Sequence, residues 1–154
     1  APYATILSMD VERLDPSQVA ERFDYIVMGD VIEHLQNPWK AIENMRELLA
    51  PGGEVIASIP NVGHISNLYE VLSGNWTYKS MGLLDRTHLR FFTKKEIIKL
   101  FQEAQFDIQD MRYVTVPYPD IGERLREELL SLQTISVDAE DLDAYQWLVR
   151  AKRV

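Results

Sequence analysis

The densest chemistry in this chain lies in the six residues Asp30 to Leu35, which read DVIEHL. In a helix, Asp30, Glu33 and His34 would be spaced i, i+3 and i+4 and would share one face. Two carboxylates and an imidazole on one face can bind a divalent ion or exchange protons with a substrate. A further histidine, His88, follows in the segment LDRTHLRFF. The spacing therefore predicts a metal or acid–base site made of Asp30, Glu33 and His34, and His88 is a further candidate ligand.

A purely structural interpretation fits the same residues. Asp30 and Glu33 have the spacing of N-cap and N3 in a capping box, which would use both carboxylates to start a helix. His34 would then be a hydrogen-bonded wall of a pocket. His64, which follows residues 60–63 at the end of a predicted strand, could also face the site. A loop histidine is, however, more often only solvated. Spacing alone leaves both interpretations open.

The elements that would position these residues alternate between strands and helices. Runs of β-forming residues predict strands at Ala4–Ser8, Phe23–Gly29, Glu54–Ile59, Phe106–Val116 and Tyr145–Ala151. Three helices are also predicted. The first begins at Asn37-Pro38 and stops at Pro51-Gly52-Gly53, and the second begins with the capping box Thr93-Lys94-Lys95-Glu96. The third has an apolar stripe made of Ile121, Leu125, Leu129 and Leu132. On the first helix, Trp39 belongs to the apolar stripe that should face the core. The acidic run at Asp138–Asp143 is predicted to be a solvated loop.

Residues 61–92, called the cover segment below, interrupt this alternation. The segment is too long for an ordinary connection, and its aromatic content argues against disorder. We expect it to cover the substrate side of the site. Trp76 and Tyr78 would either stack on a substrate or pack the segment onto the sheet. Ion pairs between Asp85 and Arg86, and at Arg90, would hold it in place.

Composition limits the class of protein. The 154 residues are 46% hydrophobic and 26% charged, which suits one globular domain over residues 1–154. Without cysteine there is neither a disulfide framework nor a thiolate metal site. The net charge of −8 argues against general affinity for nucleic acid. No apolar run is long enough to span a bilayer, so we expect a cytoplasmic protein without a membrane partner.

The order of these motifs resembles class I, Rossmann-like S-adenosylmethionine-dependent methyltransferases, from about residue 4 to residue 151. The resemblance implies an α/β fold whose sheet is mostly parallel, with an antiparallel strand pair at the C-terminus. It makes Phe23–Gly29 the fourth strand of seven. The turn Gly29, Asp30 and Val31 would lie along the methionine part of the cofactor, and Met9, Asp10 and Val11 along its adenine.

The glycine-rich loop of that family is missing from the sequence, together with the first two strands. We therefore expect a partial domain in which the edge of Phe23–Gly29 is left unpaired, a known liability for a sheet. Taken alone, such a chain should bind the cofactor poorly. Two alternatives remain: Ala4–Ser8 has moved beside Phe23–Gly29, or a second chain forms a homo-oligomer through the exposed edge.

The resemblance implies an enzyme that transfers a methyl group from S-adenosylmethionine to an oxygen of a small molecule or glycan, with His34, Glu33 and His88 as catalytic residues. Ubiquinone-pathway O-methyltransferases and many presumed glycan methyltransferases have a similar Glu-His turn. The small-RNA 2′-O-methyltransferases have a similar turn and a later histidine, and these residues hold a metal. Metal-dependent 2′-O-methylation of RNA is thus one alternative. A noncatalytic methyltransferase-like module that acts in assembly is the other.

Overall fold

The structure is a computed structural model that describes residues 8–118 and 120–154. Its centre is a sheet with the strand order β1-β2-β4-β3. The strands are β1 (Phe23–Gly29), β2 (Leu49–Pro60), β3 (Phe106–Val114) and β4 (Gln146–Arg153). Strand β1 runs parallel to β2, whereas β4 is antiparallel to both β2 and β3. The predicted α/β class and the antiparallel C-terminal strand pair are confirmed, but the described sheet is mixed instead of mostly parallel, because only β1 and β2 pair in parallel.

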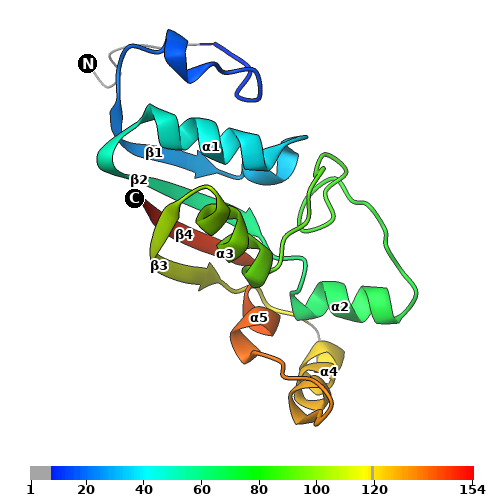
Figure 1. Ribbon diagram of the computed structural model, residues 1–154. Helices are drawn as coiled ribbons and strands as arrows, with labels where there is room; N and C mark the ends of the chain where they lie inside the picture. The colour runs from blue at the N-terminus through cyan, green and yellow to red at the C-terminus, as the bar shows by residue number, and fades with distance from the viewer. Residues whose placement is uncertain (1–7, 119) are drawn as a thin grey trace.

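Helices surround this sheet unevenly. They are α1 (Pro38–Leu48), α2 (Ile65–Leu72), α3 (Lys94–Glu103), α4 (Asp120–Ser131) and α5 (Ala139–Asp143), with short 3₁₀ turns at Pro16–Gln18 and Ile32–His34. In Figure 1, α1 and α3 lie over the sheet, while α2, α4 and α5 gather beyond one end of it. Asn37 caps α1 by accepting a hydrogen bond from the Lys40 N–H, and Pro38 fills its first position, as predicted.

The hydrophobic core lies between these two helices and one face of the sheet. Trp147 of β4 is fully buried there, beside Ile59 of β2, Ile42 of α1 and Phe101 of α3. The ammonium group of Lys94 lies 4.7 Å from the centre of the Trp147 ring, a cation–π contact at the start of α3. Trp147 therefore joins the two helices to the sheet.

The opposite face of the sheet is largely bare. Tyr25 and Val27 of β1 are 63% and 71% exposed, and Ile56 and Leu148 on the neighbouring strands are also exposed. Within the described chain, β1 has a hydrogen-bonded strand on one side only. This agrees with the expected unpaired edge. Most of the predicted strand Ala4–Ser8 lies outside the described residues.

The region between α1 and β2 differs from the prediction. The helix ends at Leu48 and the chain enters β2 at once, so that Pro51-Gly52-Gly53 lies within the strand instead of before it. Gly52 takes a φ of 75°, and the pairing of β1 with β2 shifts register between Phe23 and Tyr25. The glycines thus form an irregularity in the sheet, because a positive φ is easily reached only without a side chain.

Several other predictions made from local sequence patterns were wrong. Among the described residues, Thr93 makes no side-chain hydrogen bond at the start of α3, so the predicted capping box is absent. The acidic run forms α5, which Asp138 caps by accepting from the Glu140 N–H. The stripe on α4 is not buried, since Ile121 is exposed, and Trp39 is 46% exposed on α1. No helix in the described part of the chain is both long and apolar enough to cross a membrane.

Replacing Trp147 tests the role assigned to the core. We expect Trp147→Ala to lower the free energy of unfolding by about 3–5 kcal/mol, because it leaves a large cavity between α1, α3 and the sheet. Trp39→Ala is the matched control and should cost less than about 1 kcal/mol, because that side chain is half exposed. Urea unfolding followed by far-UV circular dichroism measures both. Equal losses would show that Trp147 does not join the layers.

Candidate functional site

The candidate site begins where β1 ends. Asp30 follows Gly29 with a φ of 52°, a left-handed conformation that aspartate tolerates better than most residues. Its carboxylate accepts hydrogen bonds from Ser58 Oγ, at 3.1 Å, and from Gln146 Nε2, and its N–H donates to Ser58 Oγ at 3.0 Å. Val31, not Asp30, occupies the N-cap of the 3₁₀ turn. The capping-box interpretation is wrong, because Asp30 bonds to β2 and β4 instead.

Glu33 lies in that 3₁₀ turn and points inward. Glu33 is only 1% exposed, and its two carboxylate oxygens have no hydrogen-bond partner among the described residues. Burial raises the pKa of Glu33, and the negative charge of Asp30 adds to the rise. A buried carboxylate without partners is costly, so it favours a proton, a cation or a donating hydroxyl nearby.

In both His34 and His88, Nδ1 bonds to a backbone carbonyl and Nε2 is left for the site. The Nδ1 of His34 lies 3.1 Å from the Thr87 carbonyl oxygen, and the Nδ1 of His88 lies 3.1 Å from the Leu83 carbonyl oxygen. A carbonyl only accepts, so each Nδ1 holds the ring proton and donates it. In the neutral form of each ring, Nε2 therefore keeps a lone pair, which can accept a proton or bind a metal.

These groups meet in one cavity of about 280 Å³. The ring centres of His34 and His88 are 4.9 Å apart, and His34 Nε2 lies 4.0 Å from Glu33 Oε1. One ligand atom from each of Glu33, His34 and His88 lies within 4.8 Å of the other two. Asp30 lines the cavity but is not part of this group. The structure thus brings three of the four predicted metal ligands together.

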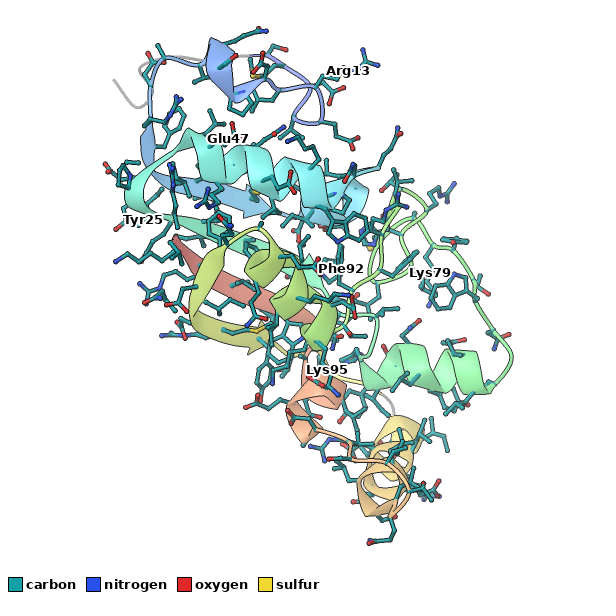
Figure 2. The ribbon with its side chains drawn as sticks, viewed as in Figure 1. Arg13, Tyr25, Glu47, Lys79, Phe92 and Lys95 are labelled. Carbon is teal, nitrogen blue, oxygen red and sulfur yellow. The ribbon has the colours of Figure 1, made fainter. Side chains whose placement is uncertain are left out.

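The cover segment closes over the cavity through backbone contacts. The carbonyl of Glu33 accepts from the N–H groups of Leu89, at 2.8 Å, and Arg90, at 3.0 Å, and the Arg90 guanidinium donates to the Gln36 carbonyl. Figure 2 shows Lys79 on this segment and Phe92 where it meets the body of the protein. Residues of this segment therefore line the cavity, and main-chain bonds together with the Arg90 side chain attach the segment beside it.

The ion pairs predicted for the cover segment do not form in the described structure. The carboxylate of Asp85 instead accepts from the Thr87 N–H at 2.8 Å and from its hydroxyl at 2.6 Å. These bonds lower the pKa of Asp85 and keep it ionised at the rim of the cavity. Trp76 packs edge to face against Phe91, with ring centres 5.4 Å apart, which favours its packing role.

The residues predicted to contact adenine form a separate turn. Asp10 accepts from the Glu12 N–H at 3.0 Å, and Glu12 accepts from the Asn37 N–H at 2.8 Å. These bonds fix the turn beside the start of α1, at the end of the sheet toward which β1 points (Figure 1). Met9 and Asp10 are exposed there, and Val11 packs against the core. The two predicted cofactor turns thus lie at the same end of the fold.

His64 is not the solvated loop histidine that its sequence context favours. It is fully buried and caps α2, where its Nδ1 accepts from the Ser66 N–H at 3.2 Å. Its ring packs edge to face against Tyr118 and Tyr145. Burial lowers its pKa to about 4, so the ring is neutral near pH 7. Sequence analysis did not identify this role because it predicted no helix at the position of α2 within the cover segment.

Comparisons with known proteins show what this chain is similar to. A family model described as a methyltransferase domain matches residues 6–110. Ubiquinone biosynthesis O-methyltransferase from Cereibacter sphaeroides is 28% identical over 98 residues, covering 64% of this chain and 40% of that protein. The same enzyme from Psychrobacter cryohalolentis is 32% identical over 95 residues, covering 60% and 36%. The chain thus spans about two fifths of the length of these curated relatives.

Solved structures resemble the fold at low sequence identity. A methyltransferase from Archaeoglobus fulgidus that depends on S-adenosylmethionine superposes with a TM-score of 0.58 at 11% identity, covering 96% of this chain and 66% of that one. The N-methyltransferase NodS from Bradyrhizobium japonicum, in complex with S-adenosylhomocysteine, has a TM-score of 0.52 at 18% identity, with coverage of 94% and 52%. These likenesses establish the fold alone.

The neutral His64 predicts how stability depends on pH. The unfolded ring binds its proton near pH 6.5 and the native ring only near pH 4, so acid favours unfolding between these values. We expect the free energy of unfolding to fall across this window by up to about 3 kcal/mol more than in His64→Asn. Asparagine keeps an acceptor for the Ser66 N–H. Urea titrations at several pH values measure the difference, and equal slopes would rule out a neutral native His64.

Proposed function

The chain belongs to the methyltransferase domain family, and on that premise we propose that it forms the acceptor site of an S-adenosylmethionine-dependent O-methyltransferase acting on a small molecule or glycan. One observation carries the proposal: Glu33, His34 and His88 meet in one cavity, and both histidines keep Nε2 free. The names of the curated relatives, which are O-methyltransferases, support oxygen as the acceptor atom.

The cavity suits proton removal from a hydroxyl group. The Nε2 of His34 takes the proton, and the carboxylate of Glu33, 4.0 Å away, stabilises the positive ring that results. The hydroxyl oxygen then bonds to the methyl carbon in line with the carbon–sulfur bond, which breaks with its electron pair going to sulfur. The proton passes from His34 to solvent. Positioning of the hydroxyl supplies the rest of the acceleration.

Two turns would hold the cofactor, which supplies an electrophilic methyl group when bound. Gly29 is exposed at the end of β1 and leaves room for close approach beside Asp30 and Val31. Asp10 offers an exposed carboxylate that can accept from an amino group, in the turn with Met9 and Val11. Their common position at the carboxyl end of β1 is where open α/β sheets bind ligands.

The surroundings favour a small acceptor over RNA. Three carboxylates line the cavity, those of Asp30, Glu33 and Asp85, and neither lysine nor arginine lines it in the described structure. The net charge of the chain is −8. A phosphate-rich strand would be repelled by such a site. The assembled site also favours an enzyme over a noncatalytic module, since assembly alone needs no free imidazole lone pairs.

Replacing His34 tests the proton-transfer role. We expect His34→Ala to slow methyl transfer from labelled S-adenosylmethionine to catechol or methyl α-D-glucopyranoside by about 100-fold or more. Calorimetric affinity for S-adenosylhomocysteine should change by less than about twofold, because His34 acts on the acceptor. Gln36→Ala, an exposed side chain two residues on, is the control and should keep both properties. Equal loss of transfer and binding in His34→Ala would refute this role.

A divalent cation held by Glu33, His34 and His88 is a second candidate role for the same cluster. The fixed Nε2 lone pairs, the unpartnered carboxylate and the 4.8 Å spacing support it. Asp30 is engaged by Ser58 and Gln146 and would contribute from a distance. A cation there would lower the pKa of a bound hydroxyl and so replace proton transfer to His34.

Metal dependence is tested by direct binding. If the cation is present, calorimetry with Zn²⁺ or Mn²⁺ should show one site, and His88→Ala should weaken that site at least about tenfold, because a ligand is lost. Chelation should then abolish methyl transfer. Full activity after chelation and in His88→Ala would exclude the metal and leave the proton-transfer role standing.

A further inference from the structure

A second, smaller cavity adjoins the candidate site. Its volume is about 120 Å³, and its walls include Ser66, Asn67 and Glu70 of α2 and Lys79 of the cover segment. Three residues belong to the walls of both cavities, namely Met81, Gly82 and Tyr145. The two cavities therefore adjoin at these residues.

The partition between the two cavities is thin at Gly82. This glycine has a φ of 89°, and a Cβ built on it would lie 2.8 Å from the hydroxyl oxygen of Tyr145. A side chain at position 82 would thus collide with Tyr145 and fill the space between the cavities. Glycine at this position keeps the tyrosine hydroxyl at the boundary, where it faces both cavities.

Asn67 is a buried polar residue that the fold only half satisfies. It is 4% exposed, and its Nδ2 donates to the Val62 carbonyl at 2.7 Å. Because a carbonyl accepts only, this bond fixes the amide orientation and makes Oδ1 the remaining acceptor. Oδ1 is buried without a hydrogen-bond partner among the described residues. A hydrogen-bond donor at Asn67 Oδ1 would stabilise the protein, because burying an unpaired acceptor is costly.

Asn61 shows what a structural asparagine looks like in the same segment. Its Nδ2 donates to the carbonyls of Asp141, at 2.8 Å, and Ala144, at 2.7 Å, while its Oδ1 accepts from the Gly63 N–H at 3.0 Å. It is equally buried, yet its oxygen and nitrogen are both used. The fold can therefore satisfy a buried asparagine fully, and Asn67 differs because it lines a cavity.

We propose that this cavity is a second acceptor subsite, which binds a hydroxyl-bearing part of a polyhydroxylated substrate such as a sugar. The proposal rests on the proposed function and deepens it by naming the substrate class. Asn67 Oδ1 accepts from one hydroxyl, while Glu70 accepts and Lys79 donates to its neighbours. Since a polyol carries donors and acceptors on each oxygen, it matches this mixed lining, whereas a flat aromatic ring does not.

Size agrees with this assignment. A volume of about 120 Å³ is several times the roughly 10–15 Å³ that a cavity must offer to hold one water molecule. A hydroxymethyl group or the diol edge of a sugar ring fits such a space. The rest of the ring would lie beside Gly82 and Tyr145, with the hydroxyl to be methylated in the larger cavity near His34.

The test is a nuclear magnetic resonance titration of the nitrogen-15-labelled chain with methyl α-D-glucopyranoside. We expect the side-chain amide signal of Asn67 to shift saturably, while that of Asn61 stays fixed. Lys79→Met should weaken the apparent affinity by about fivefold or more, because one hydrogen bond is lost. Lys95→Met is the matched control, since this exposed lysine of α3 is not among the residues lining the cavity (Figure 2). Both lysines are exposed, so both variants should fold.

Two results would overturn the subsite. One is an Asn67 signal that does not move up to the solubility limit of the glycoside, or that moves equally in Lys79→Met. The other is an Asn67 signal that catechol shifts and the glycoside does not. S-adenosylhomocysteine added to the same sample reports on the proposed function separately, through the backbone signals of Met9 to Val11. Glycoside binding without cofactor binding would leave the subsite standing and would show that this chain alone does not form a complete cofactor site.

Discussion

The joint between the 3₁₀ turn and the cover segment is the contact on which the site depends. The carbonyl of Glu33 accepts from the N–H groups of Leu89 and Arg90, and His34 donates to the Thr87 carbonyl. These bonds hold the cover over the cavity and place His88 opposite His34. The hydrogen bond that attaches the cover at Thr87 also places the proton on His34 Nδ1. One hydrogen bond therefore both attaches the cover segment and sets which nitrogen of His34 carries the proton.

Buried polar groups divide the molecule into parts that hold the fold and parts that face a ligand. Asn61 ties β2 to the segment before β4 with every polar atom of its amide engaged. Glu33 and Asn67 are as deeply buried, yet each leaves oxygen atoms without a partner in the described chain, and each lines a cavity. An unpaired buried oxygen destabilises a protein unless something binds it, so the proposed function and the proposed subsite both start from these atoms.

The sheet has one packed face and one bare face in the described structure. Trp147 and its neighbours fill the first, whereas Tyr25 and Val27 are open on the second. Since the turn that begins at Asp30 follows directly from β1, its position depends on the pairing of β1 with β2 and on the bond from Gln146 of β4. Ser58 strengthens that support, because its side chain bonds to both the backbone and the carboxylate of Asp30.

Much of this arrangement follows from the sequence by itself. The bounds of β1, the Asn37-Pro38 start of α1 and the pairing of Glu33 with His34 rest on local patterns, because capping, periodicity and spacing act over a few residues. His88 lies far along the chain from this pair, and the family resemblance assigned it to the site. Only the tertiary structure decided that Asp30 leaves this group, that Glu33 and His64 are buried, and that Asn67 keeps a free oxygen. The partners responsible lie far along the chain: Asp30 and Gln146 are 116 residues apart, and His34 and Thr87 are 53. A local pattern carries no information about such partners, because folding alone brings them within hydrogen-bond distance.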